Sequence, residues 1–183
     1  MKGLSIRKMV FIGIMAALLC VIAPHSIPLP GLIPISLATF AVYLSGMLLG
    51  AKSGTVAVVI YILLGAVGLP VFSNYSGGFG KLFGVTGGYI FGYIFCAFLT
   101  GLFADRFRKK LWALPVGAAL GTVACYLVGT VWYMIFTGSE LIPALMACVV
   151  PFLIGDAIKI VVATVITVPV KEKLMGIMNR QAA

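Results

Sequence analysis

Long apolar segments separated by short connections constrain this chain more than any other feature of its sequence. A helix of about 20 apolar residues crosses the hydrocarbon core of a bilayer. Six segments approach or exceed this length, at about residues 6–23, 33–51, 54–69, 85–104, 111–137 and 142–170. Because 62% of the 183 residues are hydrophobic and 9% are charged, a soluble domain of this size could not bury the apolar surface. We therefore expect an all-α integral membrane protein, with residues 1–183 forming a single domain of six transmembrane helices.

Basic residues gather in alternate connections, and this pattern predicts the orientation. The basic side of the pattern comprises Lys2, Arg7, Lys8, Lys52, Arg106, Arg108, Lys109, Lys110, Lys171, Lys173 and Arg180, whereas the other connections contain only Lys81 and Glu140. Since cytoplasmic loops carry the excess of Lys and Arg, both termini are expected in the cytoplasm of a multi-pass protein of the cell membrane. The net charge of +9 then reflects orientation in the bilayer, and we expect no nucleic-acid partner.

Cysteine and histidine usage indicates neither a metal centre nor catalysis. The four cysteines, Cys20, Cys96, Cys125 and Cys148, lie in apolar segments without a C-x-x-C or Cys/His spacing, and His25 is the only histidine. We expect small buried thiols, no disulfide and no metal site. One intramembrane acid without a suitable histidine argues against an intramembrane protease. No G-x-x-x-x-G-K-[ST] motif is present, so we expect neither an ATPase site nor any other catalytic residues.

Two charged residues, Asp156 and Lys159, lie within the last apolar run. Charges at bilayer depth are costly and usually mark a functional site in the protein interior. Their i, i+3 spacing places them on one face of a helix, close enough to pair, and Pro151 is expected to bend the chain just before them. Two interpretations are open: an ion pair that only stabilises helix packing, or the polar anchor of a ligand site.

The outer connection at residues 65–84 is rich in glycine and aromatic residues. Irregular backbone near membrane depth is tolerated where it is buried in protein or lines a cavity. We expect Phe72, Tyr75, Phe79 and Phe83 to pack downward, so that this connection caps a pocket; the alternative is a flexible outer loop.

The position of Asp156 along its helix favours a pocket on the outer side. Asp156 precedes Lys171 by 15 residues, which is roughly 22 Å of helix and reaches the outer half of the membrane core. Thr86 and Tyr89 begin the fourth predicted span at its outer end. We therefore expect these residues, Lys159 and the Gly-rich connection to converge on one outward-facing cavity.

The first span carries two stripes of small residues. Gly13 and Ala17 form one pair, and Ala16 and Cys20 form a neighbouring one. Such stripes let helices approach closely. Packing within the bundle and docking against a separate membrane subunit are equally consistent with this spacing.

Four separated motifs resemble those of the BioY family, the biotin-specific substrate-binding (S) subunits of energy-coupling-factor (ECF) vitamin transporters. They are Gly68-Leu-Pro-Val-Phe72, Ser76-Gly-Gly78, Gly84-Val-Thr-Gly-Gly-Tyr89 and Gly155-Asp-Ala-Ile-Lys159, and the resemblance covers essentially the whole chain. Two departures are visible. Val85 stands where the family usually has proline, and Ile90 stands where some members have a basic residue.

The resemblance implies a six-helix fold with an outward-facing biotin site. Asp156 and Lys159 would be its polar anchors, and the other pocket or loop residues would be Phe72, Ser76, Gly77, Gly78, Thr86, Gly87, Gly88 and Tyr89. The ureido ring of biotin offers two N–H donors and a carbonyl acceptor, which suit a carboxylate and an ammonium. Which group meets which end of biotin is left open. Without a base at position 90, the biotin carboxylate would be met by Lys159, Lys81 or backbone donors.

The resemblance also implies partners but no cofactor. The subunit would dock on a transmembrane coupling subunit that carries a pair of ABC-type ATPases, with the small-residue faces at Gly13, Ala16, Ala17 and Cys20 as the contact. The alternatives are an S subunit for a different small vitamin, or a proton-coupled carrier in which Asp156 relays protons.

Overall fold

The computed structural model describes residues 6–27, 33–108 and 110–179, which are mostly helical. Its elements are α1 (Ile6–Ile22), β1 (Ser26–Ile27), β2 (Ile35–Ser36), α2 (Ala38–Ala66), the 3₁₀ turn η1 (Ser73–Tyr75), α3 (Phe79–Leu82), α4 (Gly87–Arg106), α5 (Ala113–Thr137), α6 (Leu141–Cys148), η2 (Val150–Phe152) and α7 (Leu153–Asn179). Lys2, Lys109, Arg180 and residues 28–32, between the first and second predicted spans, lie outside the described residues.

The described helices have the length and composition of a membrane bundle. Four of them are long and apolar enough to cross a bilayer, namely Ala38–Ala66, Gly87–Arg106, Ala113–Thr137 and the stretch Leu141–Lys171. With 17 residues, α1 lies at the lower limit of that length. The all-α prediction holds except for a two-residue antiparallel hairpin, in which Ser26 pairs with Ser36 and Ile27 with Ile35.

The second and third predicted spans are the two arms of α2, and the chain reverses between them. Gly50 has φ 77° and ψ −179°, a conformation that interrupts the helix and suits glycine. The Ser45 hydroxyl donates to the Gly54 carbonyl at 2.9 Å, although nine residues of straight helix would rise about 13.5 Å. The carboxylate of Asp105 in α4 accepts a hydrogen bond from the Ala51 N–H at 2.8 Å, which caps the second arm.

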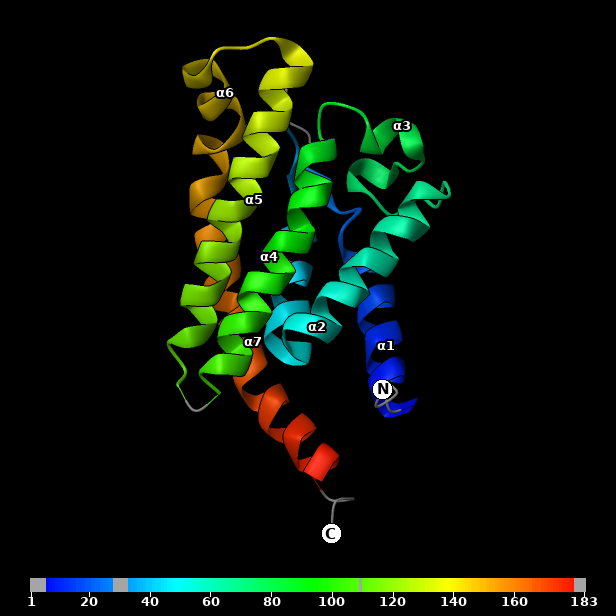
Figure 1. The fold of residues 1–183 in the computed structure, drawn as a ribbon, viewed down its shortest axis with the longest axis vertical. Helices are drawn as coiled ribbons and strands as arrows, with labels where there is room; N and C mark the ends of the chain where they lie inside the picture. Colours follow the sequence, from blue (N-terminus) through cyan, green and yellow to red (C-terminus); the bar gives the residue numbers. More distant parts are fainter. Residues whose placement is uncertain (1–5, 28–32, 109, 180–183) are drawn as a thin grey trace.

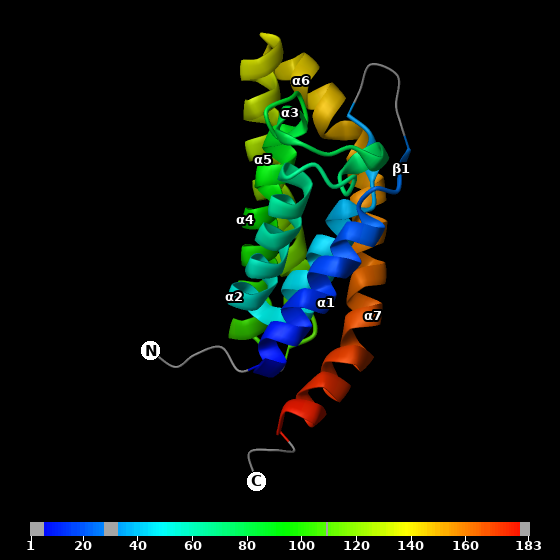
Figure 2. The same ribbon diagram turned by 90° about the vertical axis from the view of Figure 1, so that its right-hand side faces the viewer.

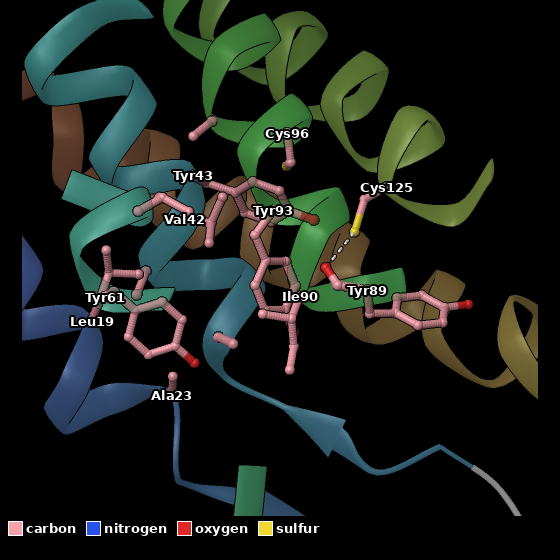
Figure 3. Close-up of a cluster of buried hydrophobic side chains, with 14 of the residues drawn as sticks. Leu19, Ala23, Val42, Tyr43, Tyr61, Tyr89, Ile90, Tyr93, Cys96 and Cys125 are labelled. Atoms are coloured by element: carbon pink, nitrogen blue, oxygen red, sulfur yellow. Dashed lines mark hydrogen bonds between the residues drawn. The ribbon is translucent and has the colours of Figure 1, made fainter. Parts of the chain in front are cut away.

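Close helix packing at the centre of the bundle depends on small residues. α4 packs mainly against α2 and α5. A Cβ added to Gly101 in α4 would overlap the backbone of Gly50 and Ala51, so only glycine allows this approach. Figure 3 shows the buried cluster around α4, in which Tyr43 and Tyr93 lie on the side of Cys96 and Tyr61 lies on the side of Leu19 and Ala23.

The cysteines are free thiols, as the sequence predicts. Cys96, Cys125 and Cys148 are buried, and Cys20 is partly buried. The Cys125 thiol donates to the Tyr89 carbonyl at 3.7 Å (Figure 3).

The two ends of the bundle differ in character (Figures 1 and 2). The start of α1, the break in α2, the α4–α5 connection and the end of α7 lie toward one end, where the basic residues are concentrated. The β1–β2 hairpin, α3 and the α5–α6 connection lie toward the other end.

Of the four aromatic residues in the Gly-rich connection that were expected to pack into the bundle, only Phe72 does so. Phe72 is 1% exposed and contacts the Tyr61 ring edge-on, but Tyr75, Phe79 and Phe83 are exposed. The prediction was wrong for these three side chains. Tyr75 ends the short turn η1, Phe79 begins the four-residue helix α3 and Phe83 follows it, so all three lie in short elements at the surface of the bundle.

Candidate functional site: a polar cluster in an aromatic pocket

A break in the last apolar run positions the charged residues. Val149, with φ −125° and ψ −56°, ends α6, and Pro151 lies in the short turn η2 that follows. α7 then begins at Leu153, so Asp156 lies in its first turn, where the helix dipole favours a carboxylate. The predicted bend at Pro151 is thus confirmed, and the predicted span 142–170 consists of α6, η2 and most of α7.

Asp156 and Lys159 form the predicted ion pair. The Lys159 ammonium lies 2.8 Å from Asp156 Oδ1, and the two side chains are 11% and 5% exposed, respectively. Removing only one partner of such a buried pair strongly destabilises the folded protein, because the remaining charge is left uncompensated.

Three residues from other elements complete the cluster. Thr39 in α2 donates to Asp156 Oδ1 at 3.0 Å, and Tyr126 in α5 donates to Asp156 Oδ2 at 2.6 Å. The Lys159 ammonium donates to the Ser36 carbonyl at 2.6 Å and to the Thr39 hydroxyl at 3.1 Å. The ion pair therefore ties α7 to both α2 and α5.

The hydrogen-bonding capacity of the cluster is used unevenly. An ammonium has three N–H donors, and those of Lys159 are matched by Ser36, Thr39 and Asp156. Asp156 Oδ2 accepts one hydrogen bond, from Tyr126, although each carboxylate oxygen has about two lone-pair sites. An incoming N–H donor therefore finds an acceptor at Asp156, whereas an incoming acceptor finds Lys159 already engaged.

The cluster forms part of the wall of a cavity between α2, α4, α5 and α7. The space that a water molecule could occupy is about 40 Å³, and about 580 Å³ lies between the lining atoms when the space that opens to the surface is counted. Six aromatic residues line it, namely Tyr61, Phe72, Tyr89, Tyr93, Tyr126 and Phe152, together with Ile33, Pro34, Ile90 and the hydroxyl residues Ser36, Thr39, Ser73 and Thr86. The charged residues in its lining are Asp156, Lys159 and Lys81. An apolar and aromatic wall with few polar anchors is typical of small-molecule sites.

The residues expected at the pocket from the sequence divide into two groups. Phe72, Thr86 and Tyr89 line the cavity together with Asp156 and Lys159. Ser76, Gly77, Gly78, Gly87 and Gly88 are absent from the lining that the described residues form.

Packing explains some of the residues outside the lining. A Cβ on Gly77 would overlap the Leu69 carbonyl. A Cβ on Gly87 would overlap the Leu82 carbonyl, and one on Gly88 would overlap the Trp132 side chain. The Ser76 hydroxyl donates to the Ser73 carbonyl at 2.7 Å within the cap. These contacts shape the connection that closes the pocket.

The sequence reasoning missed the hydroxyl groups that hold the charges. Thr39 and Tyr126 occur in apolar spans that contain many other hydroxyl residues, such as Tyr43 and Thr122. The Tyr43 hydroxyl lies 2.6 Å from that of Thr122, away from the cavity lining. Spacing along the chain does not distinguish these two pairs, because only tertiary packing brings Thr39 and Tyr126 to Asp156.

The connection between α1 and α2 contacts the connection that follows α2, and together they form the cap. The Ser26 hydroxyl donates to Asn74 Oδ1 at 2.8 Å and accepts from the Asn74 N–H at 2.9 Å. The His25 and Tyr75 rings meet edge-on, with His25 Nε2 3.2 Å from the Tyr75 hydroxyl. Asn74 and Tyr75 have φ of 60° and 53°, an uncommon conformation for residues other than glycine. A purely flexible loop would not show these specific contacts.

The small residues of α1 face two directions. Gly13 and Ala17 are exposed, and a Cβ on Gly13 would meet nothing within 4 Å. Ala16 is 3% exposed and Cys20 is partly buried in the packing between α1 and the bundle. The stripe at Gly13 and Ala17 is therefore the one available to a partner.

Together, these features define a helical membrane protein with a capped binding pocket for a small molecule. The chain belongs to the BioY family, whose sequence model matches residues 1–175.

Similar proteins carry consistent descriptions. The biotin transporter BioY of Thermotoga maritima is 44% identical over 91% of this chain and 96% of its own length. The probable biotin transporter BioY of Pyrococcus horikoshii is 33% identical over 93% and 97%, respectively. A crystal structure of the S-component for biotin from an ECF-type ABC transporter matches with a TM-score of 0.84 and 26% identity, covering 91% of this chain and 92% of that one.

Proposed function

We propose that this protein is the biotin-binding membrane subunit of an ECF-type ABC importer, which captures biotin from outside and delivers it inward. The observation that carries the proposal is the capped aromatic pocket with the Asp156–Lys159 pair in its wall, in a chain similar to biotin transporters. The aromatic wall suits the thioether ring and aliphatic tail of biotin, and the free acceptor site on Asp156 suits a ureido N–H.

The same proposal includes the arrangement in the membrane. The two arms of α2 count as separate spans, and α6, η2 and α7 together form one, which gives six spans with α1, α4 and α5. Both termini are then cytoplasmic, because the basic end of the bundle faces inward. The pocket and its cap lie toward the outer end.

Transport would require partners, because the sequence has no P-loop of its own. The subunit docks on a transmembrane coupling subunit that carries a pair of ABC-type ATPases, through the exposed Gly13/Ala17 face of α1. It does not itself hydrolyse ATP.

Titration calorimetry on the purified protein tests the ligand. Biotin is expected to bind, and thiamine and riboflavin to bind far more weakly. Asp156→Ala removes an acceptor and leaves the Lys159 charge uncompensated, so biotin affinity is expected to fall by at least about tenfold. A packing role alone would lower thermal stability and leave the affinity of the folded fraction unchanged, and that outcome would overturn the site assignment. Binding of another vitamin in place of biotin would identify an S subunit of different specificity.

A further inference from the structure

The charges that line the cavity do not balance. Asp156 and Lys159 neutralise each other in their ion pair, which leaves Lys81 as the third charged residue in the lining. The described part of the cavity therefore carries one uncompensated positive charge, and a ligand with a single negative charge would complement it.

Lys159 is poorly placed to supply a further hydrogen bond to such a ligand. Its ammonium already donates to Ser36, Thr39 and Asp156, at distances from 2.6 to 3.1 Å. Because an ammonium has only three N–H groups, an anion could bind Lys159 only by displacing one of these acceptors.

Lys81, in contrast to Lys159, has its N–H donors available for a ligand. It lies in α3, which packs against α2 and α4, on the cap rather than on α7. Its ammonium has no ion-pair or hydrogen-bond partner within residues 6–27, 33–108 and 110–179.

A second unsatisfied group lies in the same lining. The Thr86 hydroxyl is buried and has no partner among the described residues. A buried hydroxyl without a partner is costly, and a ligand oxygen would satisfy it.

We infer that Lys81 is the residue that recognises the negatively charged end of the ligand, while the Asp156–Lys159 cluster receives its polar, uncharged end. This inference rests on the proposed function, in which the ligand is biotin and the charged end is its carboxylate. Ile90 contributes an apolar side chain to the same lining, so position 90 supplies no cation in this chain. The cap thereby serves as both a cover and a charge-selective contact.

Comparison of biotin with biotinamide, which lacks the negative charge, tests the inference by calorimetry. The wild-type protein should bind biotin at least about tenfold more tightly than biotinamide. Lys81→Met should abolish this preference by weakening biotin binding and leaving biotinamide binding unchanged, whereas Lys81→Arg should retain most of it. Lys159→Met should weaken both ligands by a similar factor and retain the preference. Lys52→Met, at an exposed position near the break in α2, is the matched control and should change neither affinity.

The outcomes separate the inference from the proposed function. A wild-type protein that binds both ligands equally, or a Lys81→Met variant that keeps the full preference, would overturn the inference while the proposed function stands. Loss of the preference in Lys159→Met alone would assign the carboxylate to Lys159 instead. A wild-type protein that binds neither ligand would overturn the proposed function and the inference with it. Since Lys81 is partly exposed and unpaired within the described residues, Lys81→Met should melt at the wild-type temperature.

Discussion

Asp156 lies where three helices meet, and each contributes one hydrogen bond to its carboxylate. Thr39 belongs to α2, Tyr126 to α5 and Lys159 to α7. Burying a carboxylate is tolerable only when such partners are present. The same hydrogen bonds fix the orientation of Oδ2, the oxygen that has capacity left for a ligand.

The role of Tyr126 in orienting this oxygen gives a prediction at the residue scale. Tyr126→Phe removes the hydrogen bond to Asp156 Oδ2, and biotin affinity is expected to fall by about three- to tenfold because the carboxylate loses its fixed orientation. Tyr43→Phe is the matched control, because the Tyr43 hydroxyl contacts Thr122 in the core. The control should lower the melting temperature and leave the affinity of the folded protein unchanged. Equal affinities in both variants, measured by calorimetry, would show that Tyr126 only supports the fold.

The site was predictable from the sequence to the extent that its residues are unusual where they occur. Asp156 and Lys159 stand out because charges are costly in an apolar run. Tyr126 and Tyr43 are both tyrosines within predicted spans, and no pattern separates their roles. From the sequence, Lys81 is only one of several candidates to bind the biotin carboxylate. Only the fold shows that its ammonium has no partner among the described residues.

At the scale of elements, the break in α2 is the feature that decides how the helices are arranged. Gly50 allows the reversal, and Asp105 caps the arm that follows it. A Cβ on Gly50 would lie 2.5 Å from both oxygens of that carboxylate, so the two residues fit each other closely.

The hydrogen bond from the Ala51 N–H to Asp105 predicts that removal of Asp105 and removal of its ion-pair partner Arg108 change the stability of the protein by different amounts. Asp105→Ala leaves the Ala51 N–H without its acceptor and should destabilise the protein by about 1 kcal/mol, as loss of a helix cap does. Arg108→Ala removes only an ion pair at 3.6 Å between side chains that are 68% and 42% exposed, and it should change stability little. Thermal melting in detergent measures both. If both variants had the same melting temperature, the helix cap provided by Asp105 would have no special role in stability.

The two faces of α1 predict opposite consequences of bulky substitution. Gly13→Trp projects into open space, so it should leave folding and biotin binding intact while blocking uptake through loss of docking. Ala16→Trp overfills a buried position and should lower thermal stability, so the expectation that both stripes serve docking is revised for Ala16. Uptake assays and ligand binding on the same variants distinguish the two effects. Normal uptake by Gly13→Trp would exclude this face as the docking surface.

At the scale of the whole molecule, the positive-inside rule applied to the distribution of basic residues predicts one orientation. The basic connections lie toward one end of the bundle, and the β1–β2 hairpin and α3 lie toward the other (Figures 1 and 2). Ser36 of β2 and Lys81 of α3 are among the residues that line the pocket. Hydropathy predicted the approximate positions of the apolar helical segments, but not that two of them would form the arms of α2 or that the last would divide into α6, η2 and α7. The contacts between Ser26 and Asn74 were not, because they join connections that are 48 residues apart.

The orientation predicts the behaviour of reporter fusions. A reporter fused after Ala183 should be active only in the cytoplasm, and one inserted near Ser139, in the α5–α6 connection, only outside. Both expectations follow from the excess of basic residues at the end of the bundle where α7 terminates, which is opposite the α5–α6 connection. Activity of the two reporters on the same side would require an even number of crossings between them and would displace the pocket from the outer half.

The chain order of the polar cluster has a consequence for biogenesis. Ser36, Thr39 and Tyr126 all precede Asp156 and Lys159, so during synthesis from the N-terminus the groups that receive the charges are made first. The charged helix is thus delivered to a bilayer that already contains its acceptors. Its i, i+3 pairing also lets the two charges partition as a neutral unit. A variant that kept only one of the two charges would have an additional insertion free energy of roughly 2.5–3.5 kcal/mol. Its defect would therefore be a smaller fraction of chains inserted at the translocon, independent of ligand binding.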